Sequence, residues 1–214
     1  MRYRWIIAAL FFLTATNANA TIFTYEFDGA VTTILHDDSA NTFSSNFAVG
    51  DLVHGTYTLD DTIIPTFPRP SFARYSGNSF NVTIGSHNFS GSADHRVFNN
   101  DLPSINDAFS IINETGYTAP SLGDLISRTF FLQFFDSTRT VFSNTDMVLN
   151  PPPLSNFDSQ INGLRLDNKF NPDDYGALYY NINSLAPVPE PSTLLLLGSG
   201  MTGLVAMRRF RFRK

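Results

Sequence analysis

Apolar and polar residues alternate with a period of two along much of the chain. Phe23, Tyr25 and Phe27 fall on one side of an extended segment, and the polar residues between them fall on the other. The same alternation recurs in residues 80–84 and 163–167. Because successive side chains of a strand point to opposite faces, this period predicts β-strands with one buried face.

The composition of residues 21–187 favours the same fold class. This segment contains two Glu, one Lys and two Gln, so the straight-chain residues that favour helices are nearly absent. Phe, Tyr, Val, Ile and Thr are frequent instead, and clusters of Asn, Asp, Gly and Pro separate them. The spacing of these turn signals predicts roughly nine or ten short strands. We therefore expect an all-β, antiparallel body of the β-sandwich or jelly-roll type.

Three segments predict particular elements of this body. Thr129–Phe135 is apolar on both faces apart from Gln133, which predicts a strand at the centre of a sheet. Ile63–Arg74 contains three prolines, which lack a backbone donor and so predict a surface loop. Gly176–Leu185 predicts the last strand, and Pro187 ends it.

The charges are unevenly distributed. The 214 residues include 14 Lys+Arg and 19 Asp+Glu, for a net charge of -5. Seven of the basic residues lie near the two termini, so residues 21–187 carry 7 − 18 = −11. This acidic balance argues against a nucleic-acid partner, because phosphate contacts need clustered Lys and Arg. The absence of cysteine excludes disulfides, cysteine-ligated metals and thiol nucleophiles.

Residues 1–20 have the pattern of a signal peptide. Arg2 and Arg4 precede the apolar run Trp5–Leu13, and Ala18 and Ala20 form the small-x-small site that signal peptidase recognises. The apolar run is much shorter than the roughly 20 residues that span a membrane. We therefore expect export and cleavage after Ala20, which leaves residues 21–187 as the extracellular body.

The C-terminal segment 188–214 has three parts. Residues 188–191 read Val-Pro-Glu-Pro, and residues 193–207 contain no charge. As a helix this apolar run would reach about 22 Å, so it predicts a single short transmembrane helix. A basic tail, residues 208–214, follows and would remain on the cytoplasmic side. Its charged residues are Arg208, Arg209, Arg211, Arg213 and Lys214.

This combination of a Pro-Glu-Pro motif, a short apolar helix and a terminal basic cluster resembles the PEP-CTERM sorting domain. The resemblance implies that an exosortase, a membrane-bound protease-transferase of Gram-negative bacteria, recognises Pro189, Glu190 and Pro191. It also implies a precursor anchored in the inner membrane through residues 193–207 and a product at the cell surface or in the extracellular matrix. The implied setting is exopolysaccharide, as in biofilms. Taken alone, the apolar segment would fit an ordinary tail anchor.

The body contains no recognisable catalytic motif. His36, His54, His87 and His95 lack the spacing of metal ligands, and His54 is expected to point outward from a strand. No G-x-S-x-G elbow occurs in the body. Adjacent aspartates occur at residues 37–38, 60–61 and 173–174, where a role in turns is sufficient to explain them.

One run of oxygen-bearing side chains gives a calcium hypothesis. Asp167, Asp173 and Asp174 lie within residues 167–174 and could supply carboxylate ligands. The run lacks the glycine of an EF-hand loop and contains Lys169. We expect no other cofactor.

The leading hypothesis is a non-enzymatic exported protein whose partners are signal peptidase, exosortase, the membrane and extracellular polysaccharide. A carbohydrate-binding β-sandwich is the first alternative. It would need exposed aromatic side chains, and the candidates are Tyr75, Tyr117, Tyr175, Tyr179 and Tyr180. A secreted hydrolase is the second alternative, and the missing catalytic motif argues against it.

Overall fold

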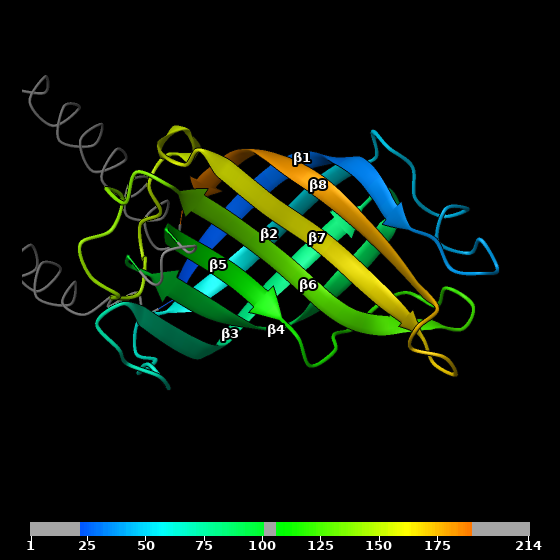
Figure 1. Ribbon diagram of the computed structural model, residues 1–214, viewed down its shortest axis with the longest axis horizontal. Coiled ribbons are helices and arrows are strands. Elements are labelled where there is room, and N and C mark those ends of the chain that lie inside the picture. The colour runs from blue at the N-terminus through cyan, green and yellow to red at the C-terminus, as the bar shows by residue number, and fades with distance from the viewer. Residues whose placement is uncertain (1–21, 101–105, 190–214) are drawn as a thin grey trace, which may run out of the picture. The chain divides into compact units, whose positions relative to one another are not determined.

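The computed structural model describes residues 22–100 and 106–189. Eight antiparallel strands form a closed barrel in which each strand pairs with the next and the last pairs with the first (Figure 1). The strands are β1 (Ile22–His36), β2 (Leu52–Asp60), β3 (Phe72–Ile84), β4 (His87–Phe98), β5 (Asp107–Asn113), β6 (Leu125–Asp136), β7 (Ser159–Asn168) and β8 (Tyr175–Pro187). A short 3-10 helix, η1 (Leu154–Asn156), precedes β7.

The prediction of an all-β antiparallel body is confirmed, but the prediction of a sandwich or jelly roll is wrong. The strands are fewer and longer than expected, because β1 spans 15 residues and β3 and β8 span 13 each. Register shifts interrupt the pairing of β1 with β8 at three places. Such irregularities bend and twist a strand, which allows a sheet to curve and close.

Aromatic and aliphatic side chains fill the barrel. The faces predicted from alternation are the buried ones, including Tyr25, Phe27, Phe80, Val82, Ile84, Leu164 and Leu166. Phe80 of β3 and Phe130 of β6 stack across the interior with ring centroids 3.9 Å apart. An eight-stranded barrel is just wide enough for side chains to fill its interior, and the many phenylalanines supply that volume.

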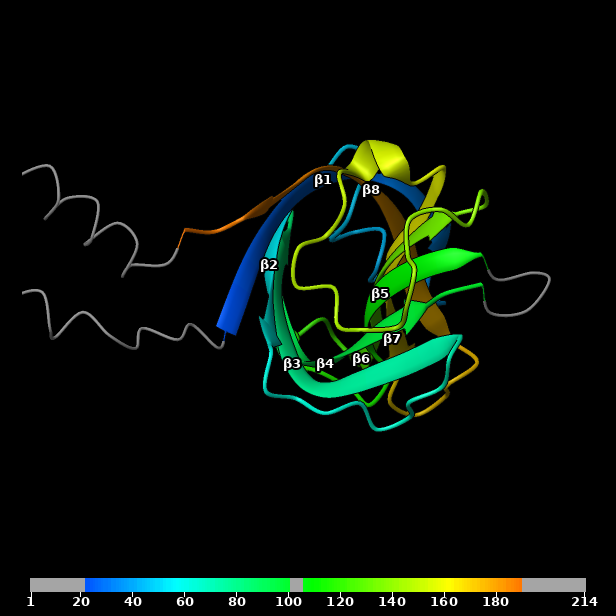
Figure 2. The same cartoon turned by 90° about the vertical axis from the view of Figure 1, so that its left-hand side faces the viewer.

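Long loops close both ends of the barrel. The β1–β2 loop, residues 37–51, supplies Phe43 and Phe47 to the core at the end where β1 finishes. The β6–β7 loop, residues 137–158, packs Phe142 and Phe157 against the core at the opposite end. Figure 2 shows this second loop, in yellow-green, crossing the barrel opening together with η1.

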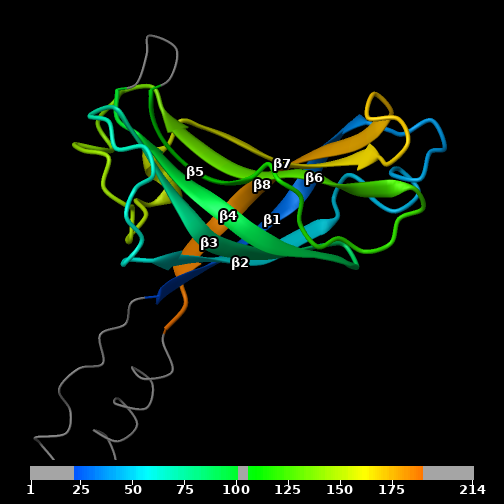
Figure 3. The ribbon, with the colours of Figure 1, turned by 90° about the horizontal axis from the view of Figure 1, so that it is seen from below.

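The first and last strands begin and end side by side. Tyr25 of β1 is paired with Pro187 of β8, so the chain enters and leaves the barrel at the same end (Figure 3). The prediction that the final strand stops at Pro187 is therefore confirmed.

Two other predicted elements differ in detail. Thr129–Phe135 does lie in a strand, β6, but one face alone is fully buried, through Phe130, Leu132 and Phe134. Phe131 and Phe135 lie half-buried on the outer face, so the strand is not covered on both sides. The proline-rich loop is confirmed, although it ends earlier than expected because β3 begins at Phe72.

Several predictions lie outside the described residues. These are the signal peptide at residues 1–20 with Ala18 and Ala20, the apolar helix at residues 193–207 and the basic tail at residues 208–214. Within residues 22–100 and 106–189, no helix has the length and apolar character needed to cross a membrane.

Candidate functional site

The sorting motif begins where the barrel ends. β8 runs to Pro187, and the N–H of Val188 still donates to the carbonyl of Thr24 at 2.8 Å. Pro189 follows, is exposed and has no N–H to continue the ladder. The described chain is therefore bonded to β1 up to Val188 and leaves it at Pro189, while Glu190 and Pro191 lie outside the described residues.

A polar group on the outer face joins β1, β2 and β8 near this end. His54 Nδ1 lies 2.8 Å from Asp28 Oδ1, and Ser184 Oγ donates to Asp28 Oδ2 at 3.0 Å. These hydrogen bonds, from His54 first and then from Ser184, lower the pKa of Asp28. His54 points outward as predicted, with its side chain 56% exposed. The serine contacts the aspartate and not the histidine, so this arrangement does not activate a nucleophile.

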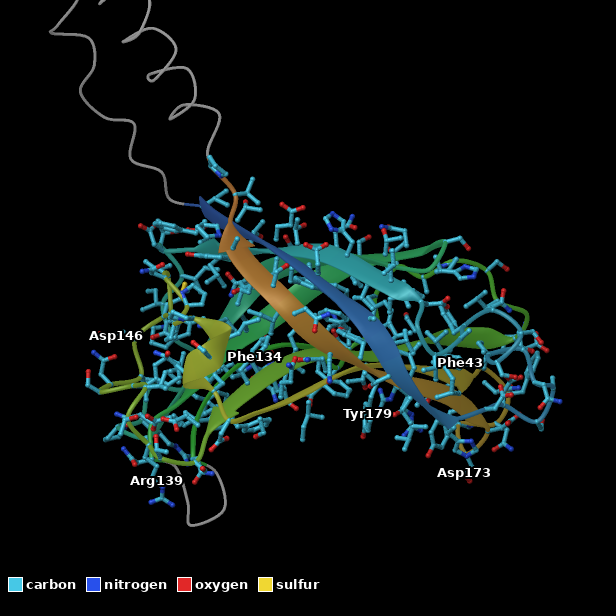
Figure 4. All side chains as sticks on the ribbon, turned by 90° about the horizontal axis from the view of Figure 1, so that it is seen from above. Phe43, Phe134, Arg139, Asp146, Asp173 and Tyr179 are labelled. Carbon is cyan, nitrogen blue, oxygen red and sulfur yellow. The ribbon has the colours of Figure 1, made fainter. Side chains whose placement is uncertain are left out.

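The three carboxylates of the calcium hypothesis have separate partners. Asp167 is buried on β7 and accepts from Arg165 Nε at 2.6 Å. Asp174 accepts from the backbone N–H and the hydroxyl of Ser39, at 2.7 and 2.8 Å. Asp173 lies exposed in the β7–β8 loop (Figure 4). Among the residues that the structure describes, no group of three or more His, Asp or Glu side chains is arranged to hold a metal ion.

Most of the tyrosines proposed for sugar binding are not available at the surface. Tyr75, Tyr117 and Tyr180 are buried, so their prediction as exposed aromatics is wrong. Tyr175 is half-buried, with the Arg165 guanidinium 4.0 Å from its ring centroid. Tyr179 is exposed on the outer face of β8, where its ring lies 6.2 Å from that of Phe131.

A cluster of arginines on the outer face, where β3 pairs with β4, was not predicted from the sequence. Arg74 and Arg96 are direct cross-strand partners. Asp94 Oδ2 lies 2.6 Å from Arg74 Nη2 and 3.5 Å from Arg96 Nη2. Glu114 Oε2 lies 2.6 Å from Arg96 Nη2. We call Arg69, Arg74 and Arg96 the arginine face. The sequence shows these arginines, but it does not show the β3–β4 register that places Arg74 beside Arg96.

Two buried polar groups organise the loop that covers the end near the chain termini. His95 is fully buried on β4, and its Nε2 accepts from the N–H of Val148 at 3.2 Å. Burial lowers the pKa of His95 to about 3, so the ring is neutral at physiological pH. Asp136 accepts from the backbone N–H groups of Thr138, Thr140 and Val141 at 2.8, 2.8 and 3.1 Å.

Comparison with known proteins identifies the segment that follows the barrel. The PEP-CTERM protein-sorting motif matches residues 187–211, which include the Pro-Glu-Pro sequence and the apolar run. Searches of curated proteins and of solved structures find no match to the chain. The resemblance inferred from the C-terminal residues is therefore confirmed: the chain carries the PEP-CTERM sorting motif, which implies export and exosortase-type sorting of a surface protein.

Proposed function

We propose that the protein is a non-enzymatic component of the cell surface or extracellular matrix, associated with exopolysaccharide. The observation that carries this proposal is the position of the sorting motif. It follows β8 directly, so the whole described barrel lies on the N-terminal side of the recognised segment. The barrel is then the product that sorting delivers.

The roles of the paired aspartates support a structural or binding function. Asp38 Oδ1 accepts from the N–H of Phe43 at 2.7 Å, and Asp60 Oδ1 accepts from the N–H of Thr62 at 2.9 Å. Asp174 binds Ser39 in the same way. These carboxylates are used to fix loops, which is the common role of aspartate in turns.

The route to the surface follows from the two terminal segments. Signal peptidase would remove residues 1–20, and the apolar run at residues 193–207 would hold the precursor in the inner membrane. An exosortase would then act on Pro189, Glu190 and Pro191. Because the chain is bonded to β1 up to Val188, the enzyme meets the folded barrel immediately before the motif.

Intact-mass measurement of cell fractions tests this route. In wild-type cells we expect a surface protein that lacks residues 1–20 and the basic tail. Cells without the exosortase, or with E190Q, should accumulate a precursor in the inner membrane. Asp173→Asn is the matched control, since it changes an exposed acidic residue outside the motif. A surface protein that retains Arg208–Lys214 in wild-type cells would contradict the proposal.

A further inference from the structure

The arginine face lines a depression that combines positive charge with aromatic surface. Its lining consists of Phe67, Arg69, Phe72, Arg74 and Arg96, and its volume is about 290 Å³. Residues 21–187 contain seven basic residues against 18 acidic ones, so three of those seven lie around this one depression. Such a concentration of cations in a strongly acidic body indicates a local preference for an anion.

The charges on the two strands are only partly balanced. Like charges that face each other across a strand pair repel, and Arg74 and Arg96 are such a pair. Asp94 and Glu114 offset them, which leaves 3 − 2 = +1 for the arginine face. Both carboxylates contact the arginines through Nη2, and Nη1 of each arginine has no ionic partner among the described residues. Nε of Arg74 and Nε of Arg96 are buried without a hydrogen-bond partner and do not face a ligand.

Arg69 is the most accessible member of the group. It is exposed in the β2–β3 loop, and it forms no ion pair with any other described residue. The loop is fixed beside β3, since the N–H of Arg69 donates to the carbonyl of Phe72 at 2.8 Å. A guanidinium with free donors in a fixed loop can bind a carboxylate through two hydrogen bonds.

The aromatic part of the lining selects among anions. Phe67 is 52% exposed, and Phe72 is half-buried and packs on Phe98 with ring centroids 4.8 Å apart. Inorganic phosphate would gain nothing from these phenyl faces, and a neutral sugar would gain little from the arginines. A sugar ring that carries a carboxylate presents both an apolar C–H face and an anion.

A second depression continues from the first. It also has a volume of about 290 Å³ and shares Arg74 with it. Its other lining includes Ser76, Ser92, Asn113 and Thr115, which offer hydroxyl and amide groups, and the carboxylates of Asp94 and Glu114. The two depressions share Arg74; one is cationic and aromatic, and the other is lined by hydroxyl, amide and carboxylate groups. They fit two consecutive residues of one polymer, with the carboxylate-bearing residue in the first depression.

We propose that this outer surface of β3 and β4 binds a carboxylate-bearing sugar residue of an acidic polysaccharide, with Arg69, Arg74 and Arg96 around the carboxylate and Phe67 and Phe72 against the ring. The inference deepens the proposed function by naming its ligand class and rests on it for the extracellular setting. It also gives the carbohydrate-binding alternative a location that the tyrosines did not provide.

Calorimetric titration of the full-length protein in detergent tests the proposal, with oligogalacturonate as the probe. We expect binding to oligogalacturonate that weakens at high salt, and much weaker binding to its fully methyl-esterified, uncharged form. R69Q should weaken binding by roughly tenfold to a hundredfold, and F67A should weaken it as well. R139Q is the matched control, because Arg139, in the β6–β7 loop (Figure 4), does not line the depression.

Three results would overturn the proposal: equal affinity for the charged and esterified forms, equal affinity for inorganic phosphate, or equal losses in R69Q and R139Q. Absence of binding would do the same. Circular dichroism of each variant shows whether the barrel is intact, and R69Q breaks no described ion pair. The titration does not depend on sorting. A negative titration would therefore overturn the ligand proposal without affecting the sorting route, and a negative mass measurement would overturn the sorting route without affecting the titration.

Discussion

The ring of Phe43 lies directly against the backbone of Gly176. A Cβ atom at residue 176 would lie 2.1 Å from Cδ2 of Phe43, far inside van der Waals contact. Phe43 (Figure 4) is fully buried. It packs on Phe47 with ring centroids 4.8 Å apart. The missing side chain at the start of β8 thus makes room for the aromatic residue that closes this end of the barrel.

G176A is therefore expected to destabilise the barrel by about 1–3 kcal/mol or more, because a rigid ring must move to admit the methyl group. Urea unfolding measures this loss. G50A provides the comparison, since a Cβ at residue 50 meets nothing within 4 Å and only the φ of 96° disfavours alanine. That variant should lose about 1–2 kcal/mol, from backbone strain alone. Equal losses in the two variants would show that the Phe43 contact is unimportant.

Asp136 is expected to be the main polar support of the β6–β7 loop. Burial raises the pKa of this carboxyl, but the hydrogen bonds from Thr138, Thr140 and Val141 outweigh burial and lower it. D136A removes the acceptor for three backbone N–H groups and should cost about 1–3 kcal/mol by urea unfolding. D173A, at an exposed position, should change stability by less than about 0.5 kcal/mol. Similar values for both would disprove the role given to Asp136.

His95 should make the barrel less stable as the pH falls. Its pKa is lowered from 6.5 to about 3 by burial, so the unfolded chain takes up a proton that the folded chain excludes. The contribution of neutral His95 to the free energy of unfolding is therefore fully present above pH 6.5 and is lost as the pH drops from 6.5 towards 3. The slope for one proton approaches about 1.4 kcal/mol per pH unit.

Urea midpoints between pH 7.5 and pH 4.5 check this prediction. H95Q keeps an acceptor for the N–H of Val148. Its free energy of unfolding should decrease less steeply with falling pH than that of the wild type, whatever its stability at neutral pH. A wild-type slope in H95Q would assign the pH dependence to other groups.

The end of β8 should limit access to the sorting motif. Processing needs an extended peptide, and the chain is bonded to β1 as far as Val188. A flexible Gly-Ser segment inserted between Val188 and Pro189 should therefore speed conversion of precursor to product in a pulse-chase measurement. The same segment inserted after the exposed Ile64 serves as control and should leave the rate unchanged. Slower conversion by the insertion at Pro189 would mean that the enzyme requires the barrel next to the motif.

Alternation predicted the strands and their buried faces, but it could not predict closure. Phe80, Val82 and Ile84 are buried as expected, because the period of two is a local property. The pairing of Tyr25 with Pro187 joins residues at opposite ends of the body, and no local pattern reports it. The apolar outer face of β6 was misleading for the same reason. Phe131 pairs with Ile112 of β5, and residue 112 is almost completely buried although it lies on the outside.

The C-terminal motif could be predicted because its parts are contiguous, whereas the arginine face could not. Arg74 and Arg96 are distant in sequence, and only the β3–β4 register brings them together. The predictions for Tyr75, Tyr117 and Tyr180 were wrong for a related reason: Tyr75, for example, alternates with polar neighbours, but its ring is buried on the inner side. A composition rich in aromatic residues does not show which of them fill the barrel.

Closure of the sheet also limits how copies of this protein can assemble once they are concentrated outside the cell. Every one of the eight described strands has two partners over part of its length, so no strand presents unpaired N–H and C=O groups along a whole edge. An open sheet would offer such an edge to a second copy, which is the route to edge-to-edge aggregates and fibres. Here that route requires the β1–β8 seam to open first. Association between copies at the cell surface is therefore expected to use side chains of the outer face and the loops, and such contacts are reversible without unfolding of the barrel.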